Sequence, residues 1–238
     1  MSKVRAVIFD CYSTLIDIKT NEEKGEVFHY LSLYLQYYGA RMNAESLKSA
    51  LKLEREQYLY SKKDERYPEI DLEIVFGNIL KKEGLDNPFL AESCCKLFRV
   101  LSREHFQLFP DSLPVLEEMR QKGYQLGVIS DAQKVFCLDE GKMLGLNQFF
   151  SRIIMSTHLG FRKPDPRIFM VACTLLEISP LEAVYIGNDP ETDVGGAKRA
   201  GMKAILLDRE SENTNTEPKP DFYANNLWDA WGWIKSNS

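Results

Sequence analysis

Several polar side chains lie where buried strands are expected to end. Asp10 follows the apolar run over residues 4–9, and Ser130 ends the apolar run QLGVIS. In open α/β sheets, ligands bind outside the carboxyl ends of the strands, so both side chains are expected to face whatever the protein binds. Each also has an ordinary explanation when considered alone, Asp10 as a loop acid and Ser130 as a helix N-cap.

A lysine and two further aspartates extend this set. Lys163 lies in GFRKPDPRIF, just before a predicted helix N-terminus, and a positive charge beside exposed backbone N–H groups attracts anions. Asp189 and Asp193 lie in YIGNDPETDVGGAKRAG, after another apolar run. Helix capping explains Asp189, but it does not explain a second acid one turn later, followed by two glycines that permit close backbone approach. These residue types indicate an anion-binding site that also contains carboxylates.

The order of apolar runs and turns predicts an α/β fold. After residue 106, short strands over residues 125–130, 152–155, 183–186 and 204–207 alternate with helices of ordinary length. This alternation implies right-handed crossovers and a Rossmann-like parallel sheet core with helices on both faces.

The segment from residue 15 to residue 105 has a different character. Helical periodicity runs through four predicted helices, the first from about residue 21, the second after Asn43, the third over residues 71–82 and the fourth over residues 89–106. The segment shows little sign of a strand. We therefore predict a core of residues 1–14 and 106–238, and an inserted all-helical cap of residues 15–105 over Asp10.

Composition restricts the class of protein. The 238 residues are 44% hydrophobic, which is enough for one large core or for a core plus a smaller domain. The net charge of -5 provides no basic surface for nucleic acid, and no window approaches ~18 uncharged apolar residues, so no membrane span is expected. With no signal peptide, we expect a cytoplasmic protein with five reduced cysteines. The oligomeric state stays open.

The polar segments together resemble the haloacid-dehalogenase-like hydrolase superfamily. FDCYSTL is similar to its nucleophile motif, Ser130 to its hydroxyl motif, RKPDPRIF to its lysine motif and GNDPETDVGGAKRAG to its acidic motif, in the family's order. One subgroup carries a helical cap after the first motif. The resemblance implies that Asp10 is the nucleophile, that Thr14 and Ser130 orient the bound group, and that Lys163 pairs with the nucleophile and the substrate. It also implies that Asp193 ligates a metal through water or holds Lys163.

The resemblance further implies a Mg²⁺ cofactor, held by Asp10, Asp189 and the main-chain carbonyl of Tyr12. A shared Mg²⁺ would neutralise the repulsion between an attacking aspartate and a phosphoryl group. We expect substrate binding by four residues, which are Ser130, Asp131, Arg41 and Arg55.

The chain departs from the family pattern at Tyr12, where phosphatases of the family usually carry a second aspartate as acid and base. Because phenol is a poor acid at pH 7, a loss of roughly 10²–10⁴-fold is expected on poor leaving groups. Tyr12 resembles the 2-haloacid dehalogenases of the family, which need neither a leaving-group acid nor a metal. The acidic motif of those enzymes, however, resembles serine–x–asparagine, whereas this chain has Gly187-Asn188-Asp189 at that place.

Retention of Asp189 favours Mg²⁺-dependent hydrolysis of a small phosphate ester through an aspartyl-phosphate intermediate at Asp10. Metal-independent 2-haloacid dehalogenation, with Asp10 as nucleophile, is the first alternative. A non-catalytic anion-binding protein is the second.

Overall fold

The computed structural model describes residues 3–210 and 216–237 of the chain. Its centre is a six-stranded sheet in the order β5-β4-β1-β6-β7-β8, and every neighbouring pair is parallel. The strands are β1 (Ala6–Phe9), β4 (Gln125–Ser130), β5 (Arg152–Met155), β6 (Ala183–Gly187), β7 (Lys203–Leu207) and β8 (Phe222–Ala224). The predicted Rossmann-like α/β core is confirmed.

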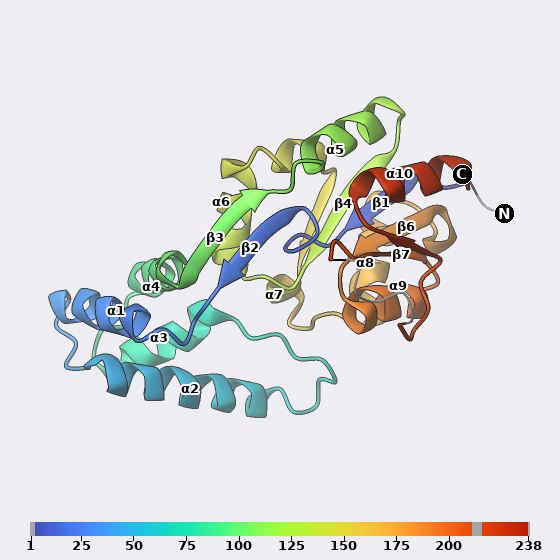
Figure 1. Ribbon diagram of the computed structural model, residues 1–238. Helices are drawn as coiled ribbons and strands as arrows, with labels where there is room; N and C mark the ends of the chain where they lie inside the picture. The colour runs from blue at the N-terminus through green and yellow to red at the C-terminus, as the bar shows by residue number, and fades with distance from the viewer. Residues whose placement is uncertain (1–2, 211–215, 238) are drawn as a thin grey trace.

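Side chains of the central strand β1 alternate between the two faces of the sheet. Phe9 packs into one apolar cluster with α5 and α10, whereas Ile8 packs into another with α8 and α9. Figure 1 shows these two helix pairs on opposite sides of the strands. Their bounds are Ser112–Gln121 for α5, Leu227–Ser236 for α10, Pro166–Leu176 for α8 and Gly196–Arg199 for α9. Burial on both faces explains why β1 is a continuous apolar run.

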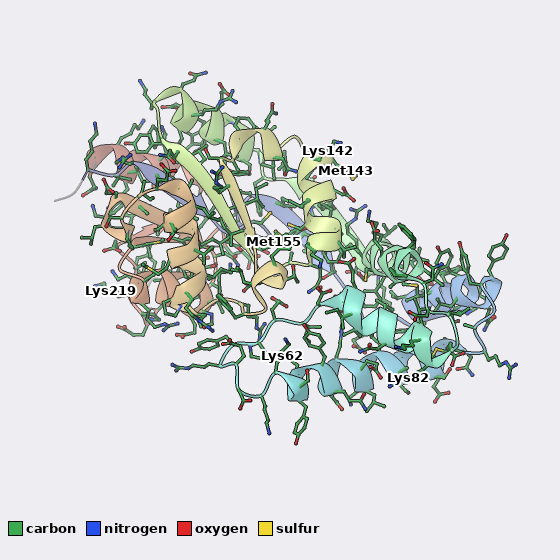
Figure 2. The ribbon with its side chains drawn as sticks, turned by 180° about the vertical axis from the view of Figure 1, so that it is seen from behind. Lys62, Lys82, Lys142, Met143, Met155 and Lys219 are labelled. Atoms are coloured by element: carbon green, nitrogen blue, oxygen red, sulfur yellow. The ribbon has the colours of Figure 1, made fainter. Side chains whose placement is uncertain are left out.

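The segment between the first two strands of the sheet contains four helices with an apolar core of their own. They are α1 (Gly25–Tyr37), α2 (Ala44–Ser61), α3 (Leu72–Lys82) and α4 (Pro88–Ser102). Asn43 caps α2 in a reciprocal pair with Ser46, and the helix follows Asn43 as expected. Figure 1 shows this bundle away from both termini, and the view from behind in Figure 2 shows Lys82 within it and Met155 at the centre of the molecule.

The prediction of a purely helical insertion is wrong at both ends of the segment. Two antiparallel strands, β2 (Ile16–Thr20) and β3 (Arg103–Leu108), connect the helices to the core. The predicted fourth helix therefore ends at Ser102 and not at residue 106. Apolar and polar residues alternate in β2 and over the last three residues of β3, and Ile18 faces Phe106 across the pair. The predicted boundary between residues 105 and 106 falls inside β3.

The remaining elements connect the sheet strands. They are α6 (Lys134–Met143), η1 (Asn147–Phe149), α7 (Ser156–Leu159), η2 (Pro180–Glu182) and η3 (Pro190–Gly195). Within the described ranges, no helix is long and apolar enough to cross a membrane. The five cysteines are buried free thiols.

Candidate active site

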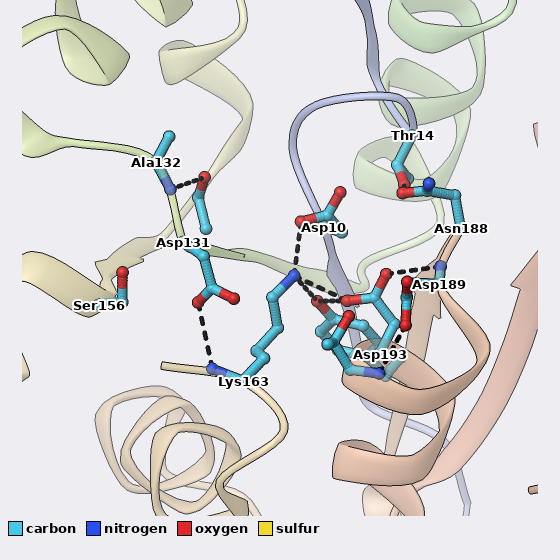
Figure 3. Close-up of polar contacts among 12 residues, drawn as sticks. Asp10, Thr14, Asp131, Ala132, Ser156, Lys163, Asn188, Asp189 and Asp193 are labelled. Carbon is cyan, nitrogen blue, oxygen red and sulfur yellow. Dashed lines mark hydrogen bonds and ion pairs between the residues drawn. The ribbon is translucent and has the colours of Figure 1, made fainter. Parts of the chain in front are cut away.

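The centre of the candidate site is a buried lysine between two aspartates. Lys163 Nζ donates hydrogen bonds to Asp10 Oδ1 at 2.6 Å and to Asp193 Oδ1 at 2.7 Å. The hydroxyl of Tyr185, on β6, lies 3.3 Å from Lys163 Nζ and donates to Asp193 Oδ1 at 3.1 Å. Figure 3 shows the ammonium group between the two carboxylates. The ends of β1 and β6 and the segment before α8 thus meet at one point.

Burial and charge act in opposite directions on this cluster. Burial raises the pKa of Asp10 to about 7, although the Lys163 charge acts to lower it. Burial would lower the pKa of Lys163, but Asp10 and Asp193 hold that pKa well above its usual value. Lys163 therefore stays charged at neutral pH, and its charge favours the carboxylate form of Asp10.

A tight turn after β1 places Thr14 beside the site. Ser13 adopts φ of 63°, in the left-handed region, and its N–H donates to the carbonyl of Ile16 at 2.7 Å. The turn leaves the Thr14 side chain fully buried, with its Oγ1 3.3 Å from Oδ1 of Asn188. Thr14 thus links the loop after β1 to the loop after β6, next to Asp10 in Figure 3.

Asp189 and Asp193 have separate tasks in the loop after β6. Asp189 Oδ1 caps η3 by accepting the N–H groups of Glu191 at 3.0 Å and Thr192 at 2.7 Å. Asp193 Oδ2 accepts the N–H of Asp189 at 3.0 Å, which aims its Oδ1 at the lysine. A Cβ atom at Gly187 would lie 2.4 Å from the Asp193 carboxyl group, so this approach requires glycine.

Ser130 and Asp131 follow β4, the neighbour of β1 on its other side. Ser130 Oγ accepts the N–H of Ala132 at 3.2 Å and lies 4.0 Å from Sγ of Cys137. Asp131 Oδ1 accepts the N–H of Lys163 at 3.2 Å, and burial raises the pKa of Asp131 above its usual value. Both residues thus lie at the carboxyl edge of the sheet with Asp10.

A cavity of about 350 Å³ lies between the insertion and the core. Arg55, on α2, lines it and pairs with Glu22 at 3.0 Å. Arg41 does not line this cavity; it is exposed between α1 and α2, and its N–H donates to Glu83. The lining residues are Tyr12, Ile18, Thr20, Glu22, Arg55, Ile70, Leu72, Arg99, Asp131, Ala132, Gln133 and Phe136.

A buried ion pair next to the cavity was not anticipated from the sequence. Arg99, on α4, donates from Nε and Nη2 to the Glu140 carboxylate on α6 at 2.8 and 2.9 Å. The hydroxyl of Tyr12 donates to the same carboxylate. The Arg99 guanidinium also lies 5.0 Å from the centroid of the Tyr12 ring and 4.6 Å from that of Phe136. The only signal in the sequence is a charge on the buried face of α4, four residues after Cys95.

The oxygen donors near Asp10 fit a small hard cation. In the described part of the chain, no group of three or more His, Cys, Asp or Glu side chains could hold a metal. Mg²⁺, however, usually binds one or two carboxylates together with water and substrate phosphate. The bonds described above occupy Oδ1 of Asp10 and Oδ1 of Asp189 and do not use the second oxygen of either carboxylate. With the Tyr12 carbonyl, this donor set is suitable for Mg²⁺.

Relatives named as phosphatases share sequence with this chain. Glyceraldehyde 3-phosphate phosphatase of Methanopyrus kandleri is 31% identical over 152 residues, which are 62% of this chain and 65% of that enzyme. Phosphoserine phosphatase of Thermus thermophilus is 30% identical over 65% of this chain and 61% of that enzyme. The match thus spans less than two thirds of either relative. N-acylneuraminate-9-phosphatase of Rattus norvegicus is 27% identical over 95% of this chain and 92% of that enzyme.

Solved structures share the whole architecture. The 2-haloacid dehalogenase from Pseudomonas syringae pv. Tomato DC3000 superposes with a TM-score of 0.77 at 25% identity, over 98% of this chain and 99% of that one. A HAD phosphatase from Thermococcus onnurineus superposes with a TM-score of 0.62 at 25% identity, over 97% and 98% of the two chains. The family described as haloacid dehalogenase-like hydrolase matches residues 4–201. The motifs, the fold and this match agree: the chain belongs to the haloacid dehalogenase-like hydrolase family.

Proposed function

We propose that the protein is a Mg²⁺-dependent phosphatase that hydrolyses a small phosphate ester through an aspartyl-phosphate intermediate at Asp10. The observation that carries this proposal is the buried ammonium of Lys163, 2.6 Å from Asp10 and 2.7 Å from Asp193. A fixed positive charge beside a carboxylate nucleophile offsets the repulsion that an incoming phosphate would meet. The phosphatase names of the curated relatives support the same reading.

The protein side chains would divide the chemistry among them. Asp10 attacks phosphorus, the bond from phosphorus to the leaving oxygen breaks, and water then releases phosphate from Asp10. Lys163 stabilises negative charge on the transferring phosphoryl group, and Asp193 positions Lys163. Ser130 would donate its hydroxyl proton to a phosphoryl oxygen, and Thr14 holds the loop beside Asp10.

Asp10, Asp189 and the Tyr12 carbonyl would hold Mg²⁺. When bound, the ion supplies positive charge that offsets the repulsion between Asp10 and the phosphate. Asp189 suits this role because its capping bonds fix the carboxylate rigidly at the end of η3.

We further propose that the inserted segment acts as a cap that selects the substrate. The cavity beneath it has a volume of about 350 Å³, within the usual range for a small-molecule site. Arg55 and Arg99 line its cap side, and Asp131 and Tyr12 line its core side.

A paired assay tests the function. Protein stripped with EDTA is incubated with p-nitrophenyl phosphate, with and without Mg²⁺, and phosphate release is measured. We expect release that depends on Mg²⁺ and that Asp10→Asn abolishes. The matched control is Asp139→Asn, the same chemical change at an exposed carboxylate on α6, which should retain activity. Activity that survives in Asp10→Asn would contradict the proposal.

Metal-independent dehalogenation is the second candidate, because Tyr12 occupies the position of the phosphatase acid. The likeness to the 2-haloacid dehalogenase at 25% identity adds support. Chloride release from L-2-chloropropionate in EDTA, without phosphate release from any ester, would establish this alternative. Anion binding without either reaction would indicate a non-catalytic binding protein.

A further inference from the structure

Hydrolysis of an alkyl phosphate needs a proton on the leaving oxygen, and the phenol of Tyr12 is badly placed to give it. The Tyr12 hydroxyl already donates its proton to the buried Glu140 carboxylate, which Arg99 fixes with two further bonds. Burial also raises the pKa of Tyr12 far above its usual value. If the protein is the phosphatase proposed above, the proton must therefore come from another group.

The cavity wall contains few titratable side chains that could supply this proton. Glu22 is on the cap side and is engaged by Arg55 at 3.0 Å. Neither Arg55 nor Arg99 gives up a proton in a protein, because the guanidinium pKa exceeds ~12. Among the described residues that line the cavity, Asp131 is thus the remaining acid.

Asp131 lies at the same edge of the sheet as Asp10. The strands β4 and β1 are parallel neighbours, with Val128 opposite Phe9, so both aspartates follow adjacent strand ends. The N–H of Lys163 donates to Asp131 Oδ1 at 3.2 Å and holds the carboxyl group in place. Figure 3 shows the backbone and the ammonium of Lys163 bridging the space between Asp131 and Asp10. Asp131 therefore lines the cavity and is tied through Lys163 to Asp10, so the leaving group of an ester bound at Asp10 would reach Asp131 by extending into the cavity.

We propose that Asp131 is the general acid that protonates the leaving oxygen, in place of the residue at position 12. As Asp10 forms its bond to phosphorus, the bond to the leaving oxygen breaks and that oxygen takes the Asp131 proton, so an alcohol departs. The Asp131 carboxylate then accepts a proton from the water that attacks the phosphorus. Release of phosphate returns Asp10 and Asp131 to their starting states.

The surroundings of Asp131 raise the pKa of its carboxyl group above the usual value. Burial is the largest cause that raises its pKa, and Asp193 acts in the same direction. Lys163 and Arg162 oppose this shift without reversing it. The negatively charged or acidic groups that face it also include Asp10 and Glu69. An acid acts best when its pKa approaches the working pH, so this environment suits the role.

Leaving-group dependence tests the proposal. Wild type and Asp131→Asn are compared on a series of aryl and alkyl phosphates with Mg²⁺, and log kcat/KM is plotted against the leaving-group pKa. We expect Asp131→Asn to lose roughly 10²–10³-fold on alkyl phosphates but less than about tenfold on p-nitrophenyl phosphate, whose leaving group needs little protonation. The alkaline fall of wild-type activity on alkyl phosphates should disappear in Asp131→Asn.

Three further variants make the result decisive. Asp131→Glu retains a carboxyl group and should recover part of the activity on alkyl phosphates. Tyr12→Phe should show the same dependence of log kcat/KM on leaving-group pKa as wild type. Asp139→Asn, exposed on α6, should behave as wild type. An equal loss of kcat/KM by Asp131→Asn on every ester would contradict the proposal. A steeper dependence of log kcat/KM on leaving-group pKa in Tyr12→Phe would also contradict it. If wild type hydrolyses no ester, the proposed function itself fails, and the acid role of Asp131 fails with it.

Discussion

Removal of Arg99 alone should cost much stability, because it would leave the Glu140 carboxylate without its main partner between the insertion and the core. The side chains of Arg99 and Glu140 are 12% and 5% exposed. Arg103 is the other cation near Glu140, at 3.6 Å, and it cannot replace the two close bonds of Arg99. Substitution of Arg99 by methionine would leave the buried Glu140 carboxylate with Arg103 at 3.6 Å and the Tyr12 hydroxyl as its partners.

The expected loss in the free energy of unfolding is large, because an unpaired buried charge destabilises a protein much more than the loss of a surface ion pair does. Removal of one partner from a buried pair typically costs about 3–5 kcal/mol, whereas exposed pairs contribute about 0–1 kcal/mol. We expect Arg99→Met to lower the free energy of unfolding by about 3 kcal/mol, since methionine retains some of the contact with the Tyr12 and Phe136 rings.

Urea unfolding followed by circular dichroism measures this change. The matched control is Arg120→Met, which removes an exposed pair with Glu117 whose side chains are 48% and 38% exposed, and should cost less than about 1 kcal/mol. The double variant Arg99→Met/Glu140→Met should be more stable than Arg99→Met, because it removes the unpaired charge. Equal losses in Arg99→Met and Arg120→Met would refute the reasoning.

Three further outcomes are expected. Lys163→Met should lower kcat/KM by at least about 10²–10³-fold while Mg²⁺ is saturating, measured as phosphate release. Gly187→Ala should displace Asp193 and lose activity, because its Cβ would lie 2.4 Å from that carboxyl group, whereas Gly77→Ala, with nothing within 4 Å of its Cβ, should retain activity. Burial raises the pKa of Glu69 from 4.5 to about 7. As pH rises from 4.5 to about 7, the unfolded chain gives up this proton while the folded protein keeps it, so the free energy of unfolding falls over this pH range. Glu69→Gln should therefore exceed wild type in unfolding free energy by up to about 3 kcal/mol near pH 8, and the gap should close near pH 4.

The sequence predicts the sheet and the grouping of polar residues because both follow from local patterns. An apolar run such as β1, ended by Asp10, marks a strand buried on both faces. Once the strands are parallel, their carboxyl ends share one edge, and residues as distant as Asp10 and Asp193 come together there. The caps at Asn43 and Asp189 are equally local, and the structure contains both.

The sequence could not predict features that depend on contacts between distant elements. The strands β2 and β3 are short, and they are recognisable only when paired with each other across the whole insertion. Arg99 and Glu140 are 41 residues apart on different helices, and no spacing connects them. The position of Arg41 outside the cavity depends on how the helices of the insertion pack, which periodicity alone does not specify.

Direct detection of the covalent intermediate tests the central claim. Wild-type protein with Mg²⁺ and excess p-nitrophenyl phosphate is quenched in acid during turnover and digested, and the peptide that contains Asp10 is analysed by mass spectrometry. The account predicts a phosphoryl group on Asp10 in wild type that is absent without Mg²⁺. Phosphate release with no phosphorylated Asp10, or with the phosphoryl group on another residue, would contradict it.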